Sequence, residues 1–436
     1  MAHLRPFAAL RYARTKQFDF SELIAPPYDV IKDEYKAQLV GQHPNNIVSI
    51  DLPHLPAKSV GPDSAYVGAN AALQEWIGAG VLVRDRRPAL YPYTQSYTHG
   101  GRTFHRRGFV ALVRLSPFGE GEVVPHEQTY PEAIIDRLKL TTATGLQLSP
   151  IFGLYSDPRH EVTNLLYKNL AKPEITATLQ GVKNDLWSVI DAEVENQVID
   201  FMGMRPIYIA DGHHRYTMAL QYQKDQIAAN GGQPLPPNHP ANYCMFVLVG
   251  MQDDGLVVLP THRMIGGMAA GFDAEQFCFA VSEHFDCNEV AVPPERLGDF
   301  ADLMTEDGPH TFGLYDGASR RLFTLKLRNL DVLKPYEPNH SDAWRRLDVA
   351  ILQRYLLDEV LQPKFNGGQP LKKGYTAYAE EIPAQTDGKT FQLALLLQPT
   401  PLHALEELGK HNEVMPPKST YFYPKLATGM VMNVVR

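Results

Sequence analysis

Short apolar runs alternate along the chain with segments in which apolar residues recur every three or four positions, and this pattern predicts a mixture of strands and helices. Residues 89–97 carry tyrosines at even spacing, and residues 109–115 are rich in β-forming side chains. We expect these two runs to pair across a turn at Gly100-Gly101. Residues 64–77 follow helical spacing and predict a helix.

The central part of the chain has the clearest succession of elements. An apolar run at 206–210 predicts a buried strand, a polar turn follows at 211–215, and helical spacing then continues to about Ala229. Upstream of this unit, residues 132–144 predict another helix. A strand that passes directly into a helix is the arrangement we expect at residues 206–229.

A second hairpin is expected after the central helix. Residues 243–250 and 256–259 are apolar and predict two strands. Asp253-Asp254-Gly255 lies between them and is typical of a hairpin turn. We therefore expect these two strands to pair with each other.

The later part of the chain gives a weaker pattern. From Thr261 onward the signal fades until an apolar helical face at 341–361, a buried strand at 390–397 and a short helix at 401–410. The elements together predict an α/β (α+β) protein built from mixed-sheet lobes. Because domains average about 150 residues, we expect an N-terminal α/β lobe at 1–150, a central lobe at 151–270 and a C-terminal α/β lobe at 271–436.

Composition narrows the function without identifying it. The 436 residues include 41 Lys plus Arg and 49 Asp plus Glu, a net charge of −8 that argues against a dedicated nucleic-acid binder. Three cysteines without metal-ligand spacing predict neither a disulfide framework nor a zinc site. No apolar stretch suits a signal peptide or the roughly 18 residues of a membrane span, so we expect a cytoplasmic protein without a membrane partner. The sequence indicates no oligomeric state.

The turn Asp211-Gly212-His213-His214-Arg215 is the strongest candidate for a binding site. It opens a helix, whose first N–H groups lack intrahelical partners and whose dipole favours an anion. Gly212 lets the backbone approach a phosphate, Arg215 offers two parallel donors, and the histidines add further donors. Asp211 suits a helix cap, a ligand hydroxyl or a metal. An ordinary helix start explains the turn less well, because two histidines and an arginine share its first turn.

A second candidate lies upstream, in the loop that contains His126 and Glu127. This pair is suited to general-base catalysis. The helix that follows carries Asp136 and Arg137, which we expect to bind substrate, with Arg137 steering an anion. A solvated turn with a capping glutamate is the alternative. The spacing required for a zinc protease is absent.

The tail at 415–425 is dense in groups that bind phosphate. Lys418, Ser419 and Lys425 are candidate phosphate ligands, and a tail that only packs its aromatic residues explains the segment equally well. The turn at 25–30 is interpreted as structural. The sequence contains neither a Walker nor a Rossmann phosphate loop, so a nucleotide site in this chain is of another kind.

Five motifs in this order resemble the bacterial and archaeal family of unknown function numbered one thousand and fifteen. They are APPYDV at 25–30, PHEQT at 125–129, DRL at 136–138, DGHHR at 211–215 and MPPKSTYFYPK at 415–425. The resemblance spans nearly the whole chain. It implies membership of a family without an established activity.

The turn at 211–215, together with Ala219, also resembles the phosphate-binding box of the ParB/sulfiredoxin-like fold, in which a Gly-x-x-Arg turn opens a helix and holds nucleotide phosphates. This resemblance implies a ParB/sulfiredoxin-like nucleotide-binding core and Mg²⁺ with ATP or ADP as cofactor. By analogy with the free serine kinases of that superfamily, it implies Glu127 as the base for a substrate hydroxyl. Histidines stand where sulfiredoxin carries its cysteine, which argues against that chemistry.

We therefore expect a nucleotide-dependent phosphotransferase, a kinase whose acceptor is a small hydroxyl-bearing metabolite such as free serine. Phosphoryl transfer needs clamped phosphates, Mg²⁺ and a positioned base more than covalent chemistry. The partners would be a nucleotide and a small-molecule substrate. Two alternatives use the same turn: a nucleotide hydrolase or phosphatase-like enzyme, and a non-catalytic nucleotide-sensing regulatory protein.

Overall fold

The computed structural model describes residues 3–15, 19–203, 205–268, 271–293 and 296–436. The chain forms two compact units. These two units do not coincide with the three successive lobes expected from the sequence, because strands from residues 1–150 and 151–270 lie in one sheet. Unit 1 comprises Met1–Pro125, Thr129–Val257 and Pro424–Arg436, and unit 2 comprises His126–Gln128 and Val258–Tyr423.

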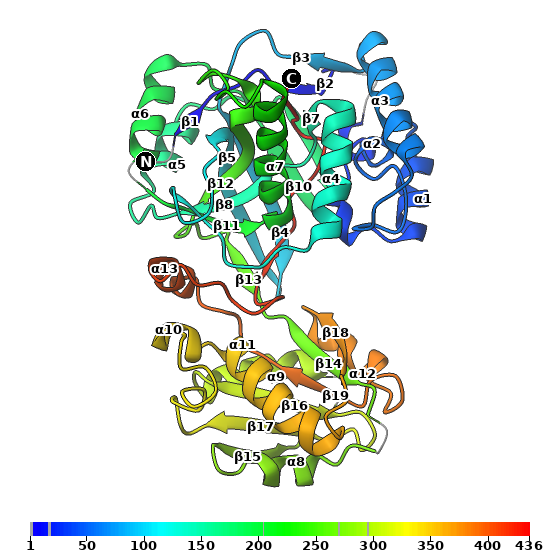
Figure 1. The fold of residues 1–436 in the computed structure, drawn as a ribbon, viewed down its shortest axis with the longest axis vertical. Helices are drawn as coiled ribbons and strands as arrows, with labels where there is room; N and C mark the ends of the chain where they lie inside the picture. Colours follow the sequence, from blue (N-terminus) through cyan, green and yellow to red (C-terminus); the bar gives the residue numbers. More distant parts are fainter. Residues whose placement is uncertain (1–2, 16–18, 204, 269–270, 294–295) are drawn as a thin grey trace. The chain divides into compact units, whose positions relative to one another are not determined.

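Nine strands of the described chain form a mixed sheet at the centre of unit 1 (Figure 1). The order is β6-β11-β8-β12-β5-β4-β10-β9, and β1 pairs with β5. Two neighbouring pairs, β6 with β11 and β8 with β12, are parallel, while the other pairs are antiparallel. The strands are β1 Leu4–Arg5, β4 Tyr91–His99, β5 Arg102–Arg114, β6 Val123–Val124, β8 Ile151–Tyr155, β9 Ile175–Leu179, β10 Val182–Leu186, β11 Ile207–Asp211 and β12 Tyr243–Gly250.

Helix α7 packs on β8 and β12 and lies beside α4, which in turn packs against α3 (Figure 1). Tyr216 and Ala219 of α7 belong to the same apolar core as the central strands. Pro131 occupies the first turn of α4, and Gly145 in a left-handed conformation ends it. The helices of unit 1 are η1 Phe20–Glu22, η2 Tyr28–Val30, α1 Asp33–Gln42, α2 Val48–Asp51, α3 Asp63–Gly78, α4 Pro131–Thr144, α5 Glu161–Tyr167, α6 Ala192–Met202, α7 His213–Ala229 and η3 Pro240–Asn242.

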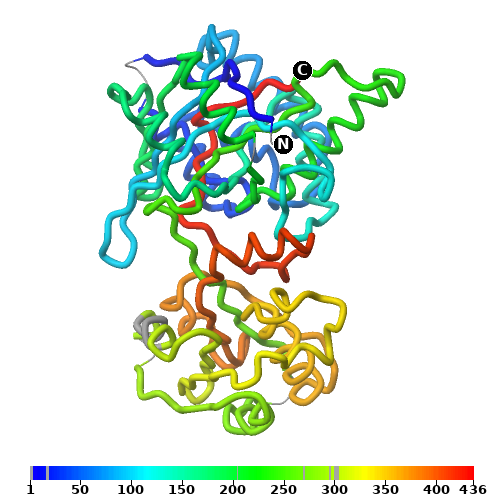
Figure 2. The backbone as a smooth tube through the Cα atoms, turned by 90° about the vertical axis from the view of Figure 1, so that its left-hand side faces the viewer, coloured from blue at the N-terminus to red at the C-terminus, as the bar shows by residue number. Residues whose placement is uncertain are grey.

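The C-terminal segment Pro424–Arg436 belongs to unit 1, and Figure 2 shows it in red among the earlier parts of the chain. Its backbone pairs with Ala25 at Thr428 and with Leu10 at Met432. Further along, β21 (Asn433–Val434) pairs with β7 (Leu146–Gln147). A second small pair joins β2 (Leu10–Tyr12) to β3 (Leu82–Arg84). The segment is therefore integrated into the unit.

Unit 2 contains an antiparallel sheet, formed in its described part by six strands in the order β15-β17-β16-β19-β14-β18. β13 and β20 form a separate pair. The strands are β13 Val257–Leu259, β14 His262–Gly266, β15 Phe285–Val290, β16 Thr311–Asp316, β17 Leu322–Leu327, β18 Lys372–Thr376, β19 Leu393–Leu396 and β20 Tyr421–Tyr423. The helices are α8 Ala274–Val281, α9 Leu297–Glu306, α10 Asp342–Arg345, α11 Asp348–Ala350, η5 Ile351–Phe365, η6 Ala379–Glu381, α12 Ile382–Gln385 and α13 His403–Lys410.

The mixed α/β class is confirmed, as are the first hairpin and the strand–turn–helix at 207–229. The hairpin expected at Asp253-Asp254-Gly255 is wrong. β12 pairs with β5 on one side and with β8 on the other, so neither of its edges is open to β13. β13 pairs with β20 instead. Within the part of the chain that the structure describes, no helix has both the length and the apolar character needed to cross a bilayer.

Stability should depend on pH through His262, which is 1% exposed in β14. Its Nδ1 accepts a hydrogen bond from the Leu397 N–H over 3.1 Å, and burial lowers the pKa of His262 to about 3 from the ordinary 6.5. Between pH values of about 3 and 6.5, His262 is protonated in the unfolded chain but neutral in the folded chain. The contribution of neutral His262 to the free energy of unfolding is therefore fully present above about pH 6.5. On acidification, the free energy of unfolding falls by up to about 1.4 kcal/mol per pH unit.

Urea unfolding from about pH 4 to pH 7 measures this slope. We expect His262→Gln, which keeps a hydrogen-bond acceptor but does not titrate, to flatten it. The same slope in both proteins would contradict the assignment.

Candidate functional site

The turn singled out at 211–215 is a strand–turn–helix junction in unit 1. β11 ends at Asp211, and α7 begins at His213. Gly212 between them has a φ of +99°, a value at which a Cβ would be strained. Since Gly212 offers no side chain to cap the helix, the first turn presents the positive end of the helix dipole without an N-cap group. An anion is a favourable neighbour for such a helix start.

Arg215 folds back over this turn. Its guanidinium donates to the carbonyl oxygen of Pro150 and, over 3.0 Å, to Asp211 Oδ2. Gly212 leaves room for this arrangement, because a Cβ there would lie 3.1 Å from the guanidinium. The Arg215 side chain is 10% exposed. The arginine is thus anchored by two acceptors of the protein itself.

Lys425, from the C-terminal segment, reaches the same carboxylate. Its Nζ lies 3.4 Å from Asp211 Oδ1. Burial alone would raise the pKa of Asp211, but the charges of Lys425 and Arg215 outweigh this and hold the pKa well below its ordinary value. Asp211 is therefore ionised at neutral pH. Lys425 and Arg215 carry two positive charges and Asp211 carries one negative charge, so the three side chains together have a net charge of +1.

Buried polar residues of the sheet hold the Lys425 segment in place. Arg106 donates to the Pro424 carbonyl oxygen over 2.6 Å, and Gln95 donates to that of Lys425 over 3.0 Å. Arg106 and Gln95 are buried on β5 and β4. Burial also lowers the pKa of Arg106 to about 10. Two successive carbonyl groups are thereby fixed, and this fixes where the Lys425 side chain begins.

The two histidines of the turn have different surroundings. His213 is buried. His214 Nε2 accepts a hydrogen bond from the Tyr130 N–H over 3.0 Å, and the two rings stack at 5.8 Å. Because Nε2 is the acceptor, neutral His214 carries its proton on Nδ1. This contact connects the turn to the chain that enters α4.

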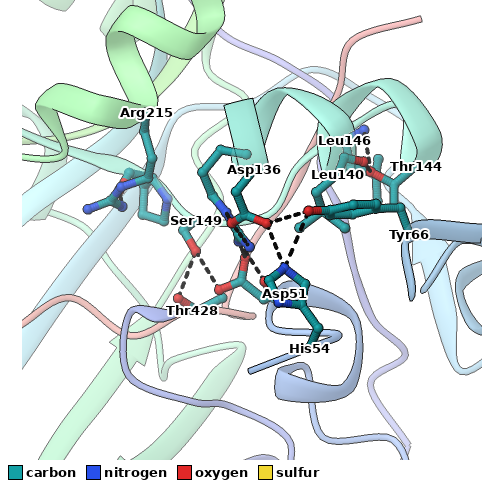
Figure 3. A network of polar contacts seen from close by, with 12 residues as sticks. Asp51, His54, Tyr66, Asp136, Leu140, Thr144, Leu146, Ser149, Arg215 and Thr428 are labelled. Carbon is teal, nitrogen blue, oxygen red and sulfur yellow. Dashed lines mark hydrogen bonds and ion pairs between the residues drawn. The ribbon is translucent and has the colours of Figure 1, made fainter. Parts of the chain in front are cut away.

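A cavity of about 30 Å³ is lined in part by Arg215. Its polar lining includes Tyr28, Asp51, Arg137 and Ser149. Ser149 donates to Asp51 Oδ2 over 3.2 Å, as Figure 3 shows. A space of this size suits a single water molecule.

Asp136 and Arg137, the expected substrate ligands, lie in a buried network, and Arg137 lines this cavity. Figure 3 shows Asp136 with its partners His54 and Tyr66. Asp136 Oδ1 accepts from Tyr66 Oη over 2.7 Å and lies 2.7 Å from His54 Nε2. Arg137 donates to Asp136 Oδ2 over 2.8 Å and to the Asp51 carbonyl oxygen over 2.6 Å. Both residues therefore have internal partners, and their binding of substrate stays a prediction.

The acidic and basic groups of this network shift each other's pKa values, because they lie close together. Burial would raise the pKa of Asp136, but Arg137 outweighs it and the pKa is lowered. Burial raises the pKa of Asp51 in spite of Arg137 and Arg215. Burial would lower the pKa of Arg137, but the negative charges of Asp51 and Asp136 outweigh this effect and raise the pKa. The arginine remains protonated between two carboxyl groups.

The loop and tail motifs meet in unit 2. The Lys418 N–H donates to Glu127 Oε1 over 3.1 Å, and His126 Nε2 lies 3.0 Å from Thr420 Oγ1. Ser419 is buried, and its hydroxyl donates to a backbone carbonyl of the tail. The structure thus brings the expected base and two expected tail ligands together.

Several polar residues around Asp136 and the cavity were not singled out as site residues by the sequence. They are Tyr28, Asp51, His54, Tyr66 and Ser149. Tyr28 lies in the turn at 25–30, where the Arg137 guanidinium sits 4.0 Å from its ring centroid. The others carry no local signal, because their partners are far away in sequence. Among the described residues, no three His, Cys, Asp or Glu side chains cluster in a way that could hold a metal ion.

Comparisons with known proteins identify a family. The family model "Protein of unknown function (DUF1015)" matches residues 4–350. No curated protein matches the chain.

Solved structures give distant similarities. A free serine kinase variant in complex with AMP shares 14% identity, with 69% of this chain and 84% of that chain covered and a TM-score of 0.33. A conserved hypothetical protein from Pyrococcus furiosus shares 16%, with 72% and 92% covered and a TM-score of 0.33. C-terminally truncated SbnI from Staphylococcus aureus shares 12%, with 74% and 87% covered and a TM-score of 0.34.

The geometry of the turn makes Gly212 harder to replace than an ordinary left-handed glycine. Gly231 also has a positive φ, but a Cβ there would meet nothing within 4 Å. We expect Gly231→Ala to lower the free energy of unfolding by about 1 kcal/mol, the cost of the left-handed backbone. Gly212→Ala should cost more, because its Cβ also displaces Arg215. Urea unfolding compares the two variants, and equal losses would contradict this packing.

Proposed function

The chain belongs to the DUF1015 family of proteins of unknown function, and for it we propose nucleotide-dependent phosphotransfer to a small hydroxyl-bearing metabolite. The observation that carries the proposal is the junction at Gly212. There a left-handed glycine opens a helix, and the ammonium group of Lys425 and the guanidinium of Arg215 share one carboxylate. A helix start and clustered cations both favour phosphate.

In this proposal the nucleotide's phosphates lie against the start of α7. Backbone N–H groups of the first turn donate to phosphate oxygens, and Lys425 supplies a compact positive charge. Arg215 adds positive potential and keeps the turn in shape through its bonds to Pro150 and Asp211. This fits the need of phosphoryl transfer for clamped phosphates.

Mg²⁺ would enter with ATP or ADP. Proteins commonly bind Mg²⁺ through one or two carboxylates together with substrate phosphates and water, and no dedicated acidic cluster is needed. Asp211 is the carboxylate of the turn, it is ionised, and its side chain is 25% exposed. The donor set at the turn therefore fits a nucleotide-borne ion, with Asp211 as the residue that would hold it.

Glu127 is the proposed base for the acceptor hydroxyl, and His126 accompanies it. A carboxylate within hydrogen-bond reach of the hydroxyl can accept its proton. The Glu127 side chain is half-buried, and its Oε1 accepts from the Lys418 N–H. This bond orients the carboxylate. Free serine is one candidate acceptor.

Replacing Lys425 should weaken nucleotide binding. Lys425→Gln removes a charge-assisted hydrogen bond, worth roughly 1.5–3 kcal/mol, so the Kd for ATP or ADP should rise about 10- to 100-fold. Lys183→Gln is the matched control, since Lys183 also pairs with a carboxylate of unit 1, that of Asp185, over 2.7 Å. The control should bind normally. Calorimetry that gives Lys425→Gln the affinity of the unchanged protein would place the phosphates elsewhere.

Replacing Glu127 tests the chemistry. Glu127→Gln keeps the size of the side chain and an acceptor for Lys418, but removes proton acceptance. Turnover should fall by about 10²–10⁴, the usual contribution of a general base, with little change in nucleotide affinity. Glu132→Gln, an exposed position in the first turn of α4, is the control. Unchanged turnover in Glu127→Gln would remove this residue from the mechanism.

Product analysis with ATP, with and without a pool of small metabolites, separates the proposal from its two alternatives. Phosphate transferred to a hydroxyl compound supports the kinase. Hydrolysis that needs no acceptor assigns a hydrolase instead. Tight binding without turnover assigns a nucleotide sensor.

A further inference from the structure

Two cysteines of unit 2 lie in contact with each other, outside the site described above. Cys278 lies on α8 and Cys287 on β15, and a short turn at residues 282–284 joins the two elements. β15 is an edge strand of the six-stranded sheet. Both cysteines are half-buried, so small solutes can reach them. Cys244 in unit 1 is fully buried and serves as an internal reference.

The local fold brings the two residues close together. Asp273 caps α8 by accepting from the N–H groups of Glu275 and Gln276, and Phe277 of this helix packs into the core. On β15, Cys287 is two positions beyond the buried Phe285 and so shares its face of the strand.

Direct contact follows from this placement. The Cys287 thiol donates to the carbonyl oxygen of Cys278 over 3.9 Å, so the Cys287 sulfur lies against the backbone of Cys278. The pair is therefore close enough for a bond between the sulfurs to need only local movement.

The two sulfurs are not equivalent. The hydrogen bond from Cys287 lowers the pKa of Cys278, and the nearby charge of Arg321 acts in the same direction. The same hydrogen bond raises the pKa of Cys287, and burial adds to this. Cys278 is thus the sulfur that ionises first, and Cys287 retains its proton. A thiolate next to a protonated thiol is the arrangement of a nucleophilic cysteine with a resolving partner.

We infer that Cys278 and Cys287 form an oxidation site that reacts with hydroperoxides and closes into a reversible disulfide. The Cys278 thiolate attacks one peroxide oxygen, the O–O bond breaks, and Cys278 becomes a sulfenic acid while hydroxide leaves. The Cys287 sulfur then attacks the Cys278 sulfur, its proton passes to the departing hydroxyl group, and water leaves. Overall, two thiols lose two electrons and two protons, and one hydrogen peroxide becomes two waters.

Hydrogen peroxide, added to the reduced full-length chain, tests this inference. After iodoacetamide blocks the remaining thiols, a protease that cleaves after glutamate separates the two cysteines, because Glu283 lies between them. Mass spectrometry should show the peptides 276–283 and 284–289 joined and lighter by two hydrogens. Dithiothreitol should restore both thiols, and Cys244 should stay alkylatable once the chain is unfolded.

Single variants assign the two roles. In Cys287→Ser, Cys278 should accumulate sulfenic acid that dimedone traps. In Cys278→Ser, dimedone should not label Cys287. The inference is overturned if the linked peptide does not form, if Cys278 and Cys287 oxidise no faster than Cys244, or if disulfides form only between chains. Because none of these readouts involves a nucleotide, they are independent of the proposed function.

Discussion

Asp211 keeps its negative charge at the end of a sheet strand, and the region around it is arranged to hold that charge. Arg215 supplies one counter-charge from the first turn of α7, and Lys425 supplies the other from the C-terminal segment. Ionic attraction over 3–4 Å is strong where water is largely excluded. The start of the helix, the Pro150 carbonyl and the C-terminal segment are consequently tied to one carboxylate.

The same alternation of charge continues into the interior of unit 1. Asp51 lies in the field of both Arg215 and Arg137, and Arg137 pairs with Asp136. Removing one partner of a buried ion pair typically costs about 3–5 kcal/mol, because the remaining charge is left uncompensated. Residues whose types suit substrate binding thus also support the fold, and a loss of activity in such variants needs a stability measurement beside it.

Local signals in the sequence were sufficient for the elements that carry the turn. Proline in the first turn, apolar spacing and a terminal glycine define α4, and an apolar run followed by glycine defines the passage from β11 to α7. Long-range partners could not be predicted in this way. His54 and Tyr66 lie 82 and 70 residues from Asp136, and nothing in their neighbourhood encodes that pairing.

Two other differences between the sequence analysis and the structure also arise because local patterns do not show long-range partners. The turn signal at 253–255 describes only local geometry, whereas the pairing of β12 was decided by competition from β5 and β8. β15 was missed because half of the residues of this edge strand are exposed, so the strand lacks a continuous apolar run. The predicted contributions of Glu127, Lys418 and Ser419 to function depend on chemistry that local spacing does not reveal.

The division of unit 1 along the chain has a consequence for its biosynthesis. Pro424–Arg436 leaves the ribosome only after all of unit 2, yet this segment pairs with residues near the beginning of the chain, Leu10 and Ala25. Folding during synthesis can proceed in sequence order only where the partners have already emerged. A nascent chain can therefore form α7 and its glycine turn early. Lys425 cannot pair with Asp211 at this turn until unit 2 has been made. The positive charge at the turn is completed last, so a ribosome-bound chain lacks one of the two cations that hold Asp211.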